Sequence, residues 1–235
     1  MKHHTREDDK MKKYAVISVD MHRGHLDPEV ATMPLPAERC KVVIENTASL
    51  FHRLRELQIP IIHVVAGFRN PEEALSNPHW RANDEDPKSV RKAARRHNMQ
   101  GSVGTEIIPA LYRDGDYIVH NKKRYNCFHM TDLEFVLKNL GVDTVIITGI
   151  NTSSCCLSTS FEATNRDYGV IMVEDCMDSM DGRDFHDAAI KIMKRIIGQV
   201  VTSGELVKMM ENTTSGGESA ARLAAQPAGV TGEKR

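Results

Sequence analysis

Short, strongly apolar segments rich in β-branched residues recur along the chain, and this recurrence is the feature that most constrains its fold. The segments are YAVISVD (14–20), PIIHVV (60–65), DYIVH (116–120), TVIITGI (144–150), GVIMVED (169–175) and QVVTSGEL (199–206). Most of them lack the alternation of apolar and polar residues that marks a strand with one face in water. The pattern therefore predicts strands that are buried on both faces.

Amphipathic helical patterns separate these segments. Residues 38–57 place apolar side chains at steps of three and four, and the segments TDLEFVLKNLG (131–141) and HDAAIKIMKRIIG (186–198) each close on a glycine suited to a helix end. Parallel neighbouring strands need long crossovers, which helices provide. We therefore predict an α/β fold: a doubly wound, three-layer α/β/α domain with a six-stranded, mostly parallel sheet.

A single domain is predicted over residues 14–210. The charged residues 1–13 are interpreted as a mobile leader, and residues 211–235, rich in Gly, Ser, Ala and Thr, as a disordered tail. A long polar segment, residues 66–106, interrupts the alternation, and loops of this length are usually lids or binding loops. Within it, the basic run RKAARRH (91–97) is interpreted as a solvated helix face rather than an anion site.

The charge balance limits the classes of partner. A formal net charge of −1 gives no electrostatic reason to bind nucleic acid or an anionic membrane surface. The five cysteines, an odd number without a disulfide-framework spacing, and the lack of an apolar targeting segment favour a cytoplasmic location. No stretch reaches the ~20 apolar residues of a membrane span. We expect a small-molecule substrate and further copies of the chain as partners.

Reactive side chains follow three of the predicted strands. Asp20 ends the first, Lys122 and Lys123 follow the third, and Cys155 and Cys156 follow the fourth, where a strand turns into a helix. Ligands of open parallel sheets bind at the carboxyl ends of the strands. A thiol at a helix N-terminus is expected to have a lowered pKa, an ammonium stabilises the thiolate, and a carboxylate carries protons. Each residue alone has an ordinary structural explanation, but their joint placement favours a catalytic site.

The chain also resembles a known family in these same motifs. Besides the strand that ends in Asp20, it contains a K-x-R-Y-x-x-F pattern (122–128) ahead of TDL, a TGIxTxxC segment (148–155) and the later DYGVIMVEDC. In this order and spacing they resemble the isochorismatase-like cysteine hydrolases. That family includes N-carbamoylsarcosine amidase, nicotinamidase, biuret hydrolase and ureidoacrylate amidohydrolase.

The resemblance implies a mechanism and assigns its residues. It selects Lys122 over Lys123 and Cys155 over Cys156, and implies that the Cys155 thiolate attacks a carbonyl carbon while Asp20 carries the proton. Backbone N–H groups of Asn151 and Cys155 would receive the oxyanion, and the Ile150–Asn151 peptide bond is expected to be cis. The resemblance implies no cofactor, and suggests a homo-tetramer or homo-dimer.

One segment departs from the family pattern. Relatives usually read MQNDF after the aspartate, whereas this chain reads MHRGH, with His22 and His25 in place of a glutamine and an aromatic residue. We interpret His22 as a substrate contact or a support for Asp20, and His25 as structural. The nicotinamidase Asp-x-His metal motif after the second strand is replaced by AGFRNP (66–71), and a metal needs three or four converging ligands. The sequence shows no second His or carboxylate group with suitable spacing, so no metal is expected.

Together these observations predict a metal-independent cysteine amidohydrolase that cleaves a C–N bond of a small ureide or amide through a covalent thioester and releases ammonia. The polar candidates for substrate binding favour an N-carbamoyl amino acid or a biuret-like ureide; the binding candidates are His22, Arg69, Trp80 and Tyr125. Two alternatives stay open. One is isochorismatase-type hydrolysis of a vinyl ether, whose family enzymes lack the cysteine, and the other is a non-catalytic binding member of the family.

Overall fold

The computed structural model describes residues 13–215, which contain a six-stranded sheet in which all neighbouring strands are parallel. The strands are β1 (Tyr14–Val19), β2 (Ile61–Ala66), β3 (Tyr117–Lys122), β4 (Thr144–Ile150), β5 (Gly169–Asp178) and β6 (Gln199–Val201). Their order is β3-β2-β1-β4-β5-β6, so the chain winds outward in both directions from β1 and β4. The predicted fold class and the first five strand positions are confirmed, but of the sixth predicted strand, residues 199–206, only Gln199–Val201 is a strand, and residues 203–206 begin the helix α8 (Ser203–Ser215).

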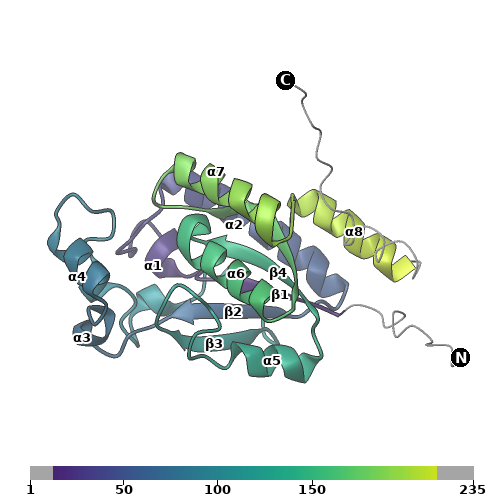
Figure 1. The fold of residues 1–235 in the computed structure, drawn as a ribbon, viewed down its shortest axis with the longest axis horizontal. Helices are drawn as coiled ribbons and strands as arrows, with labels where there is room; N and C mark the ends of the chain where they lie inside the picture. Colours follow the sequence, from purple (N-terminus) through teal and green to yellow (C-terminus); the bar gives the residue numbers. More distant parts are fainter. Residues whose placement is uncertain (1–12, 216–235) are drawn as a thin grey trace, which may run out of the picture.

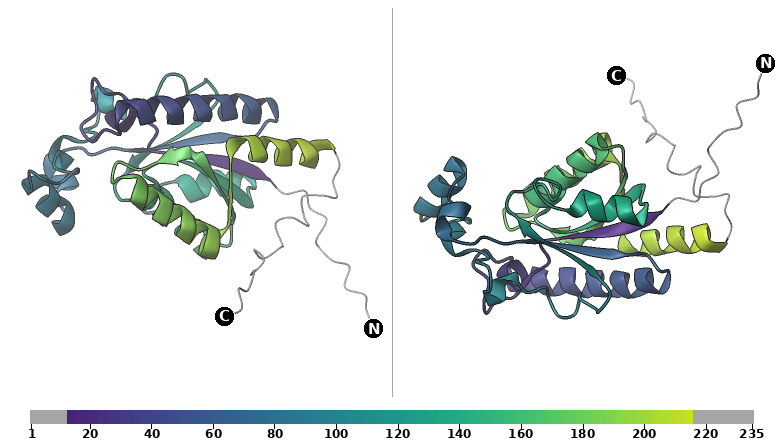
Figure 2. Two further views of the ribbon diagram at one scale, coloured as in Figure 1. Left: turned by 90° about the horizontal axis from the view of Figure 1, so that it is seen from above. Right: turned by 90° about the horizontal axis from the view of Figure 1, so that it is seen from below.

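Helices cover both faces of the sheet (Figures 1 and 2). One face packs against α2 (Ala37–Glu56) and α8 (Ser203–Ser215), and the other against α5 (Leu133–Leu140), α6 (Leu157–Asn165) and α7 (Arg183–Ile192), which continues into the π-helical turn η4 (Met193–Ile197). Each face has its own apolar core because the central strands are buried on both sides. This arrangement is the three-layer sandwich that the apolar segments predict.

Local sequence explains where these helices lie and end. Val43, Leu50, Phe51 and Leu54 form a buried stripe along α2, because three- and four-residue steps return to the same side of a helix. Helix α5 ends at Gly141, whose φ of 67° is left-handed and suits a residue without a Cβ.

The long segment after β2 folds into short helices at the carboxyl end of the sheet, near α1 (Arg23–Leu26). These are α3 (Pro71–Ala74), α4 (Pro78–Glu85), η1 (Ala94–Arg96) and η2 (Val103–Thr105). Figure 1 shows α3 and α4 projecting beyond one end of the sandwich. The Asn77 side chain caps α4 by accepting hydrogen bonds from the backbone N–H groups of His79 and Trp80. The segment predicted as a lid is therefore structured, and it lies at the predicted ligand-binding edge.

The boundaries differ slightly from the prediction. Helix α8 continues to Ser215, past the predicted domain end at residue 210, and Thr213 Oγ1 donates to the Met209 carbonyl within its last turns at 2.8 Å. The rest of the predicted tail, residues 216–235, and residues 1–12 of the predicted leader lie outside the described residues. Among residues 13–215, no helix has the length and apolar character that crossing a membrane requires.

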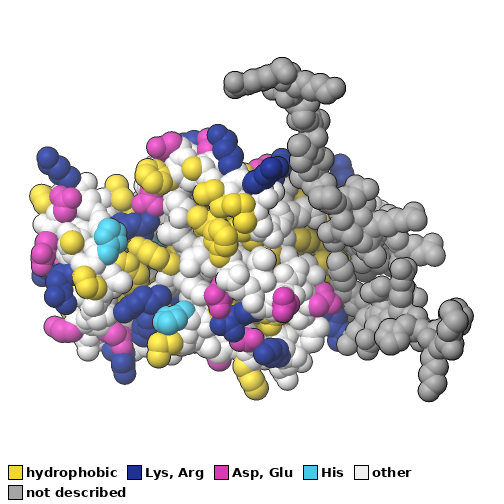
Figure 3. Space-filling view, viewed as in Figure 1, with side chains coloured by type: hydrophobic (Ala, Val, Ile, Leu, Met, Phe, Trp, Pro, Cys, Tyr) yellow, Lys and Arg dark blue, Asp and Glu magenta, His cyan; other side chains and the backbone are white. Residues whose placement is uncertain are grey.

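Apolar side chains gather on the surface formed by α6, α7 and η4 (Figure 3). The exposed large ones on these elements are Phe161, Phe185, Ile192 and Ile196, with Ile196 65% exposed. We call these four residues the α6–α7 apolar patch.

Candidate active site

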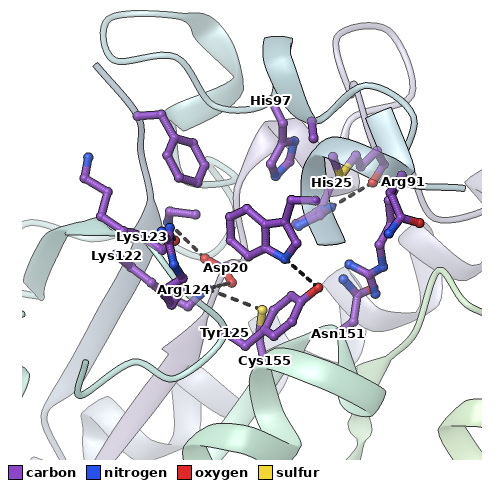
Figure 4. Close-up of a pocket in the computed structure, with 16 residues that line it drawn as sticks. Asp20, His25, Arg91, His97, Lys122, Lys123, Arg124, Tyr125, Asn151 and Cys155 are labelled. Atoms are coloured by element: carbon purple, nitrogen blue, oxygen red, sulfur yellow. Dashed lines mark hydrogen bonds and ion pairs between the residues drawn. The ribbon is translucent and has the colours of Figure 1, made fainter. Parts of the chain in front are cut away.

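Three chain segments bring Asp20, Lys122 and Cys155 together at the carboxyl end of the sheet. Asp20 directly follows β1, Lys122 ends β3, and Cys155 lies in the π-helical turn η3 (Thr152–Cys156) that joins β4 to α6. Lys122 Nζ lies 2.5 Å from Asp20 Oδ2 and 3.3 Å from Cys155 Sγ. Figure 4 shows the three side chains converging on one cavity. The structure thus places the three predicted residues in mutual contact.

The carboxylate of Asp20 is held from two sides. Its Oδ1 accepts a hydrogen bond of 2.9 Å from the backbone N–H of Ala66 at the end of β2, while Oδ2 accepts from Lys122. Asp20 has a φ of 51°, a left-handed conformation that few residues with a Cβ adopt and that turns the chain sharply after β1. The carboxylate is thereby fixed beside the thiol, which is the position a proton carrier needs.

Burial and charge oppose each other at this site. Burial raises the pKa of the Cys155 thiol above its ordinary value, and the nearby Lys122 ammonium lowers that pKa only in part. Burial also lowers the pKa of Lys122, but the neighbouring Asp20 and Cys155 outweigh it and raise the pKa above its usual range. The expectation of a lowered thiol pKa is therefore wrong for the resting site. The physical reason is that Cys155 is buried and shares the Lys122 ammonium with the Asp20 carboxylate.

The segment before Cys155 has the geometry that the resemblance implies. The Ile150–Asn151 peptide bond is cis, and Asn151 lines the cavity. Asn151 Oδ1 accepts a hydrogen bond of 2.8 Å from the backbone N–H of Met180, which fixes the side chain after β5. Thr152 Oγ1 lies 2.9 Å from His186 Nδ1, so α7 supports the turn from behind.

Aromatic side chains form a wall of the cavity opposite the sheet. Trp80 of α4 donates a hydrogen bond of 2.9 Å from Nε1 to the Tyr125 hydroxyl, and its ring meets the Phe68 ring edge to face. The structure therefore brings two predicted substrate-binding residues, Trp80 and Tyr125, to the site. The cavity is lined by Asp20, His25, Met33, Ala66, Phe68, Trp80, Asn83, Arg91, Ala94, His97, Lys122, Lys123, Arg124, Tyr125, Asn151 and Cys155.

Arg91 overturns the interpretation of residues 91–97 as a solvated helix face. Its side chain lines the cavity and is only 17% exposed. Its Nη2 donates to Asp181 Oδ2 at 2.6 Å, and the guanidinium carbon lies 5.7 Å from the centre of the Tyr125 ring. Most basic runs are solvated helix faces, which is why the run predicts one. Here the segment folds back over the edge of the sheet and brings Arg91 to the cavity. No signal in the sequence marks this position.

The two other residues predicted to bind substrate, Arg69 and His22, do not line the cavity. Arg69 is not among the lining residues: its side chain is 73% exposed and paired with Glu73. His22 is fully buried, with Nε2 3.8 Å from Asp20 Oδ1, so it lies behind the carboxylate. His25, interpreted as structural, lines the cavity, and so does His97, which the sequence reasoning did not single out. Burial lowers the pKa of all three histidines, well below the usual value for His22 and His97.

Comparisons with known proteins agree with this geometry. The isochorismatase domain family matches residues 14–205. The chain is 24% identical to maleamate amidohydrolase of Pseudomonas putida, covering 86% of this chain and 88% of that protein. It is 29% identical to enterobactin synthase component B of Escherichia coli, covering 70% of this chain but about half, 53%, of that protein.

Among solved structures, a cysteine hydrolase from Pseudomonas syringae pv. phaseolicola superposes with a TM-score of 0.71 at 26% identity, covering 88% of this chain and 96% of that one. The family match spans the whole sheet, its crossover helices and the three converging strand ends. The chain belongs to the isochorismatase family of hydrolases.

Proposed function

We propose that this chain is a cysteine amidohydrolase that cleaves a C–N bond of a small amide or ureide through a covalent thioester and releases ammonia. The observation that carries the proposal is the contact of Lys122 Nζ with both Cys155 Sγ, at 3.3 Å, and Asp20 Oδ2, at 2.5 Å, inside one cavity. A thiol, an ammonium and a carboxylate in contact contain the groups needed for nucleophilic attack and proton transfer.

The reaction proceeds in two halves. Asp20 takes the thiol proton as the sulfur of Cys155 attacks the substrate carbonyl, and Lys122 stabilises the developing thiolate. Asp20 then gives that proton to the leaving nitrogen, so that ammonia departs and a thioester remains on Cys155. In the second half Asp20 activates a water that hydrolyses the thioester. Backbone N–H groups of Asn151 and Cys155 receive the oxyanion in both halves. No metal takes part in these bond-breaking steps.

The raised thiol pKa fits this sequence of events. Because burial raises the pKa of Cys155, the resting group is a thiol that needs a nearby base, and Asp20 is beside it. In the proposed reaction the proton leaves sulfur as the carbonyl is attacked. Such a site avoids keeping a reactive thiolate exposed between turnovers.

The cavity lining supports a small, polar, anionic substrate. Arg91, Lys123 and Arg124 line the cavity beside Lys122; Lys122 pairs with Asp20, Arg91 with Asp181 and Lys123 with Glu73, whereas Arg124 has no ion pair among residues 13–215. A carboxylate suits a guanidinium because its two oxygens match the N–H groups. An N-carbamoyl amino acid, which carries both a ureide and a carboxylate, therefore fits better than biuret, which carries no acid group. Trp80 and Tyr125 enclose the substrate on the other side.

The alternative, hydrolysis of a vinyl ether, has a different chemical requirement. A vinyl ether offers no carbonyl carbon for a thiolate to attack, so Cys155 and its contact with Lys122 would have no use there. The likeness to maleamate amidohydrolase over most of both chains supports the amidohydrolase proposal. The likeness to enterobactin synthase component B covers only about half of that protein.

Ammonia release from a substrate panel tests the proposal. The panel contains N-carbamoylsarcosine, other N-carbamoyl amino acids, biuret, ureidoacrylate, maleamate and nicotinamide, with isochorismate as the vinyl ether. We expect release of ammonia from a ureide or amide, its loss in Cys155→Ala, and a trapped acyl group on Cys155 in the mass spectrum of the intact protein. Cleavage of isochorismate alone, or activity that survives in Cys155→Ala, would contradict the proposal.

Adjacent lysines provide a matched control. Lys122→Met removes the cation that touches the thiol, whereas Lys123→Met changes a lysine whose Nζ instead reaches Glu73 and the Gly67 carbonyl. We expect Lys122→Met to lower kcat by at least about 100-fold, the size of effect that loss of one charge-stabilising group gives. Because Lys123 lines the cavity without touching the thiol, Lys123→Met should act on KM and keep most of kcat.

We also propose that the protein acts in the cytoplasm as a homo-dimer or homo-tetramer, without nucleic-acid or membrane partners. All five cysteines are buried and unpaired, which supports a reducing compartment. The α6–α7 apolar patch supports contact between copies, because exposed apolar clusters mark interaction surfaces.

A further inference from the structure

Three buried histidines meet beside the catalytic cavity: His22 and His25 from the MHRGH segment, and His97 from the end of the lid segment. One ring nitrogen from each lies within 4.8 Å of the other two. We propose that these three imidazoles bind one divalent transition-metal ion, such as Zn²⁺, Co²⁺ or Fe²⁺. Three imidazoles are a ligand set that these metals favour, with further positions left for water or substrate.

Two of the rings are already oriented for a metal. His25 Nδ1 donates a hydrogen bond of 2.8 Å to the Met33 carbonyl, which leaves the lone pair on Nε2. His97 Nδ1 lies 2.8 Å from the Thr32 hydroxyl, and the centres of the two rings are 4.6 Å apart. Metal-ligating histidines are characteristically held in this way, with the second nitrogen bonded to a carbonyl or another oxygen. Neither Nε2 has a hydrogen-bond partner among residues 13–215.

The third ring, His22, is held by Asn98. Asn98 Nδ2 lies 2.7 Å from His22 Nε2 and donates to the Ala66 carbonyl at 3.1 Å, while Asn98 Oδ1 is buried without a partner. Asn98 Oδ1 also sits where a Cβ on Gly24 would come to 2.1 Å, so the glycine between His22 and His25 makes room for this support. An ion bound to His22 Nε2 would use the lone pair that faces the Asn98 amide, so binding would break this one hydrogen bond.

The distances require a modest contraction. Nitrogen ligands at about 2.0–2.1 Å from a tetrahedral zinc lie about 3.4 Å from one another. The three rings must therefore close by about 1–1.5 Å at most, which requires side-chain rotation of His22, His25 and His97. His22 and His25 are stacked, with ring centres 4.9 Å apart and planes 20° apart, so one of the two rings must turn for both lone pairs to reach one ion.

The position gives the ion a role distinct from bond breaking. His25 and His97 line the same cavity as Cys155, as Figure 4 shows, so open positions on the ion face the substrate. A carboxylate oxygen of the substrate can occupy them while the scissile carbon lies over the thiol. Lys122 and Arg91 both act on His25, but Lys122 is paired with Asp20 and Arg91 with Asp181, so neither strongly opposes a second positive charge.

This site differs from what was expected from the sequence. The expectation of no metal rested on the lack of a third ligand near His22 and His25. His97 is far away along the chain, and the fold of residues 66–106 brings it back. The ground for that expectation therefore no longer holds.

Metal binding can be measured directly, without relying on turnover. All proteins carry His3→Gln and His4→Gln to remove ligands at the start of the sequence. They are stripped with a chelator, titrated with Co²⁺ and followed by visible d–d absorption, with the bound metal counted by mass spectrometry. We expect one Co²⁺ per chain in the parent and in Cys155→Ser. We also expect about 10–100-fold weaker binding in His97→Ala and about 10-fold weaker binding in Thr32→Val, which removes only the support of His97.

His52→Ala is the control, because His52 is an exposed histidine on α2 with a side chain 56% exposed. It should bind as the parent does. Thermal unfolding of each variant shows whether it is folded, and Thr32→Val keeps the test decisive if His97→Ala is not. Binding well below one ion per chain in the parent, or binding that the His97 and Thr32 variants leave unchanged, would overturn the proposal. Because Cys155→Ser has no nucleophile but keeps the histidines, failure of the metal site and failure of the amidohydrolase proposal are distinguishable.

Discussion

At the residue scale, substitution of Arg91 most directly tests whether the substrate is anionic. Its guanidinium lines the cavity, bonds Asp181 and keeps N–H groups that can reach a ligand. We expect Arg91→Gln to raise KM for N-carbamoyl amino acids by about 10–100-fold, because a charge-assisted hydrogen bond contributes about 1.5–3 kcal/mol. KM for an uncharged ureide such as biuret should change little. Steady-state kinetics on both substrates measure the difference.

Arg95→Gln is the matched control for this substitution. Arg95 belongs to the same basic run, but its side chain is 55% exposed and pairs with Asp84. Both KM values should stay near those of the parent. Equal losses on charged and uncharged substrates in Arg91→Gln would mean that Arg91 only supports the loop through Asp181.

The thiol of Cys155 makes a pH prediction at the same scale. Since burial raises its pKa above the usual value of about 8.5, the thiolate becomes the main form only at higher pH. The rate of alkylation by iodoacetamide at Cys155 should therefore keep rising through that pH and level off above it. Arg91 lowers the pKa of this thiol, so Arg91→Gln should move the midpoint further up. Peptide mass spectrometry follows the alkylation at Cys155. A midpoint of the rate below pH 7 would contradict a raised thiol pKa.

At the element scale, β4 lies against β1 so closely that one glycine is required. Gly149 has a φ of 123°, and a Cβ there would come to 2.1 Å from the Val19 carbonyl oxygen, next to Asp20. We expect Gly149→Ala to lower the free energy of unfolding by more than about 3 kcal/mol, since backbone must move on two central strands. Gly204→Ala, in the helix α8 with open space around it, should instead raise it by about 0.5–1 kcal/mol. Urea denaturation measures both, and equal effects would refute the steric argument.

Elements with a strong local pattern could be predicted, and those that depend on packing could not. The strands follow from short apolar runs, α2 from its apolar periodicity, and α5 from the same periodicity and from Gly141 at its end, which are all properties of neighbouring residues. Asp20, a lysine at 122 or 123 and a cysteine at 155 or 156 could be predicted because they lie at or just after the ends of such strands, and the family resemblance selected Lys122 and Cys155. Arg91 and His97 could not, because their places depend on how residues 66–106 fold across the sheet edge. The prediction also ended the domain too early in helix α8, because the last turn of this helix is polar in sequence and has no apolar periodicity.

At the scale of the whole molecule, the two faces of the sandwich differ in how well they cover their apolar residues. The α6–α7 apolar patch leaves Phe185 56% and Ile196 65% exposed on one face. On the α2 side, Val42 is 55% exposed. A cluster of apolar side chains stabilises an interface more than a single apolar side chain does, because a larger contiguous apolar area is removed from water.

This difference predicts which substitution dissociates the proposed oligomer. Ile196→Lys removes an apolar contact of about 1.5–3 kcal/mol from each copy and adds a charge. In a symmetric interface the substitution counts twice, so the dissociation constant should rise by about 100-fold or more. Light scattering across a concentration series should show a dimer or tetramer for the parent and a shift to monomer for Ile196→Lys. Val42→Lys introduces the same charge on the opposite face and should leave the assembly intact. Dissociation by both variants would mean that the α6–α7 apolar patch is not the specific interface. A monomeric parent would contradict the proposed oligomer.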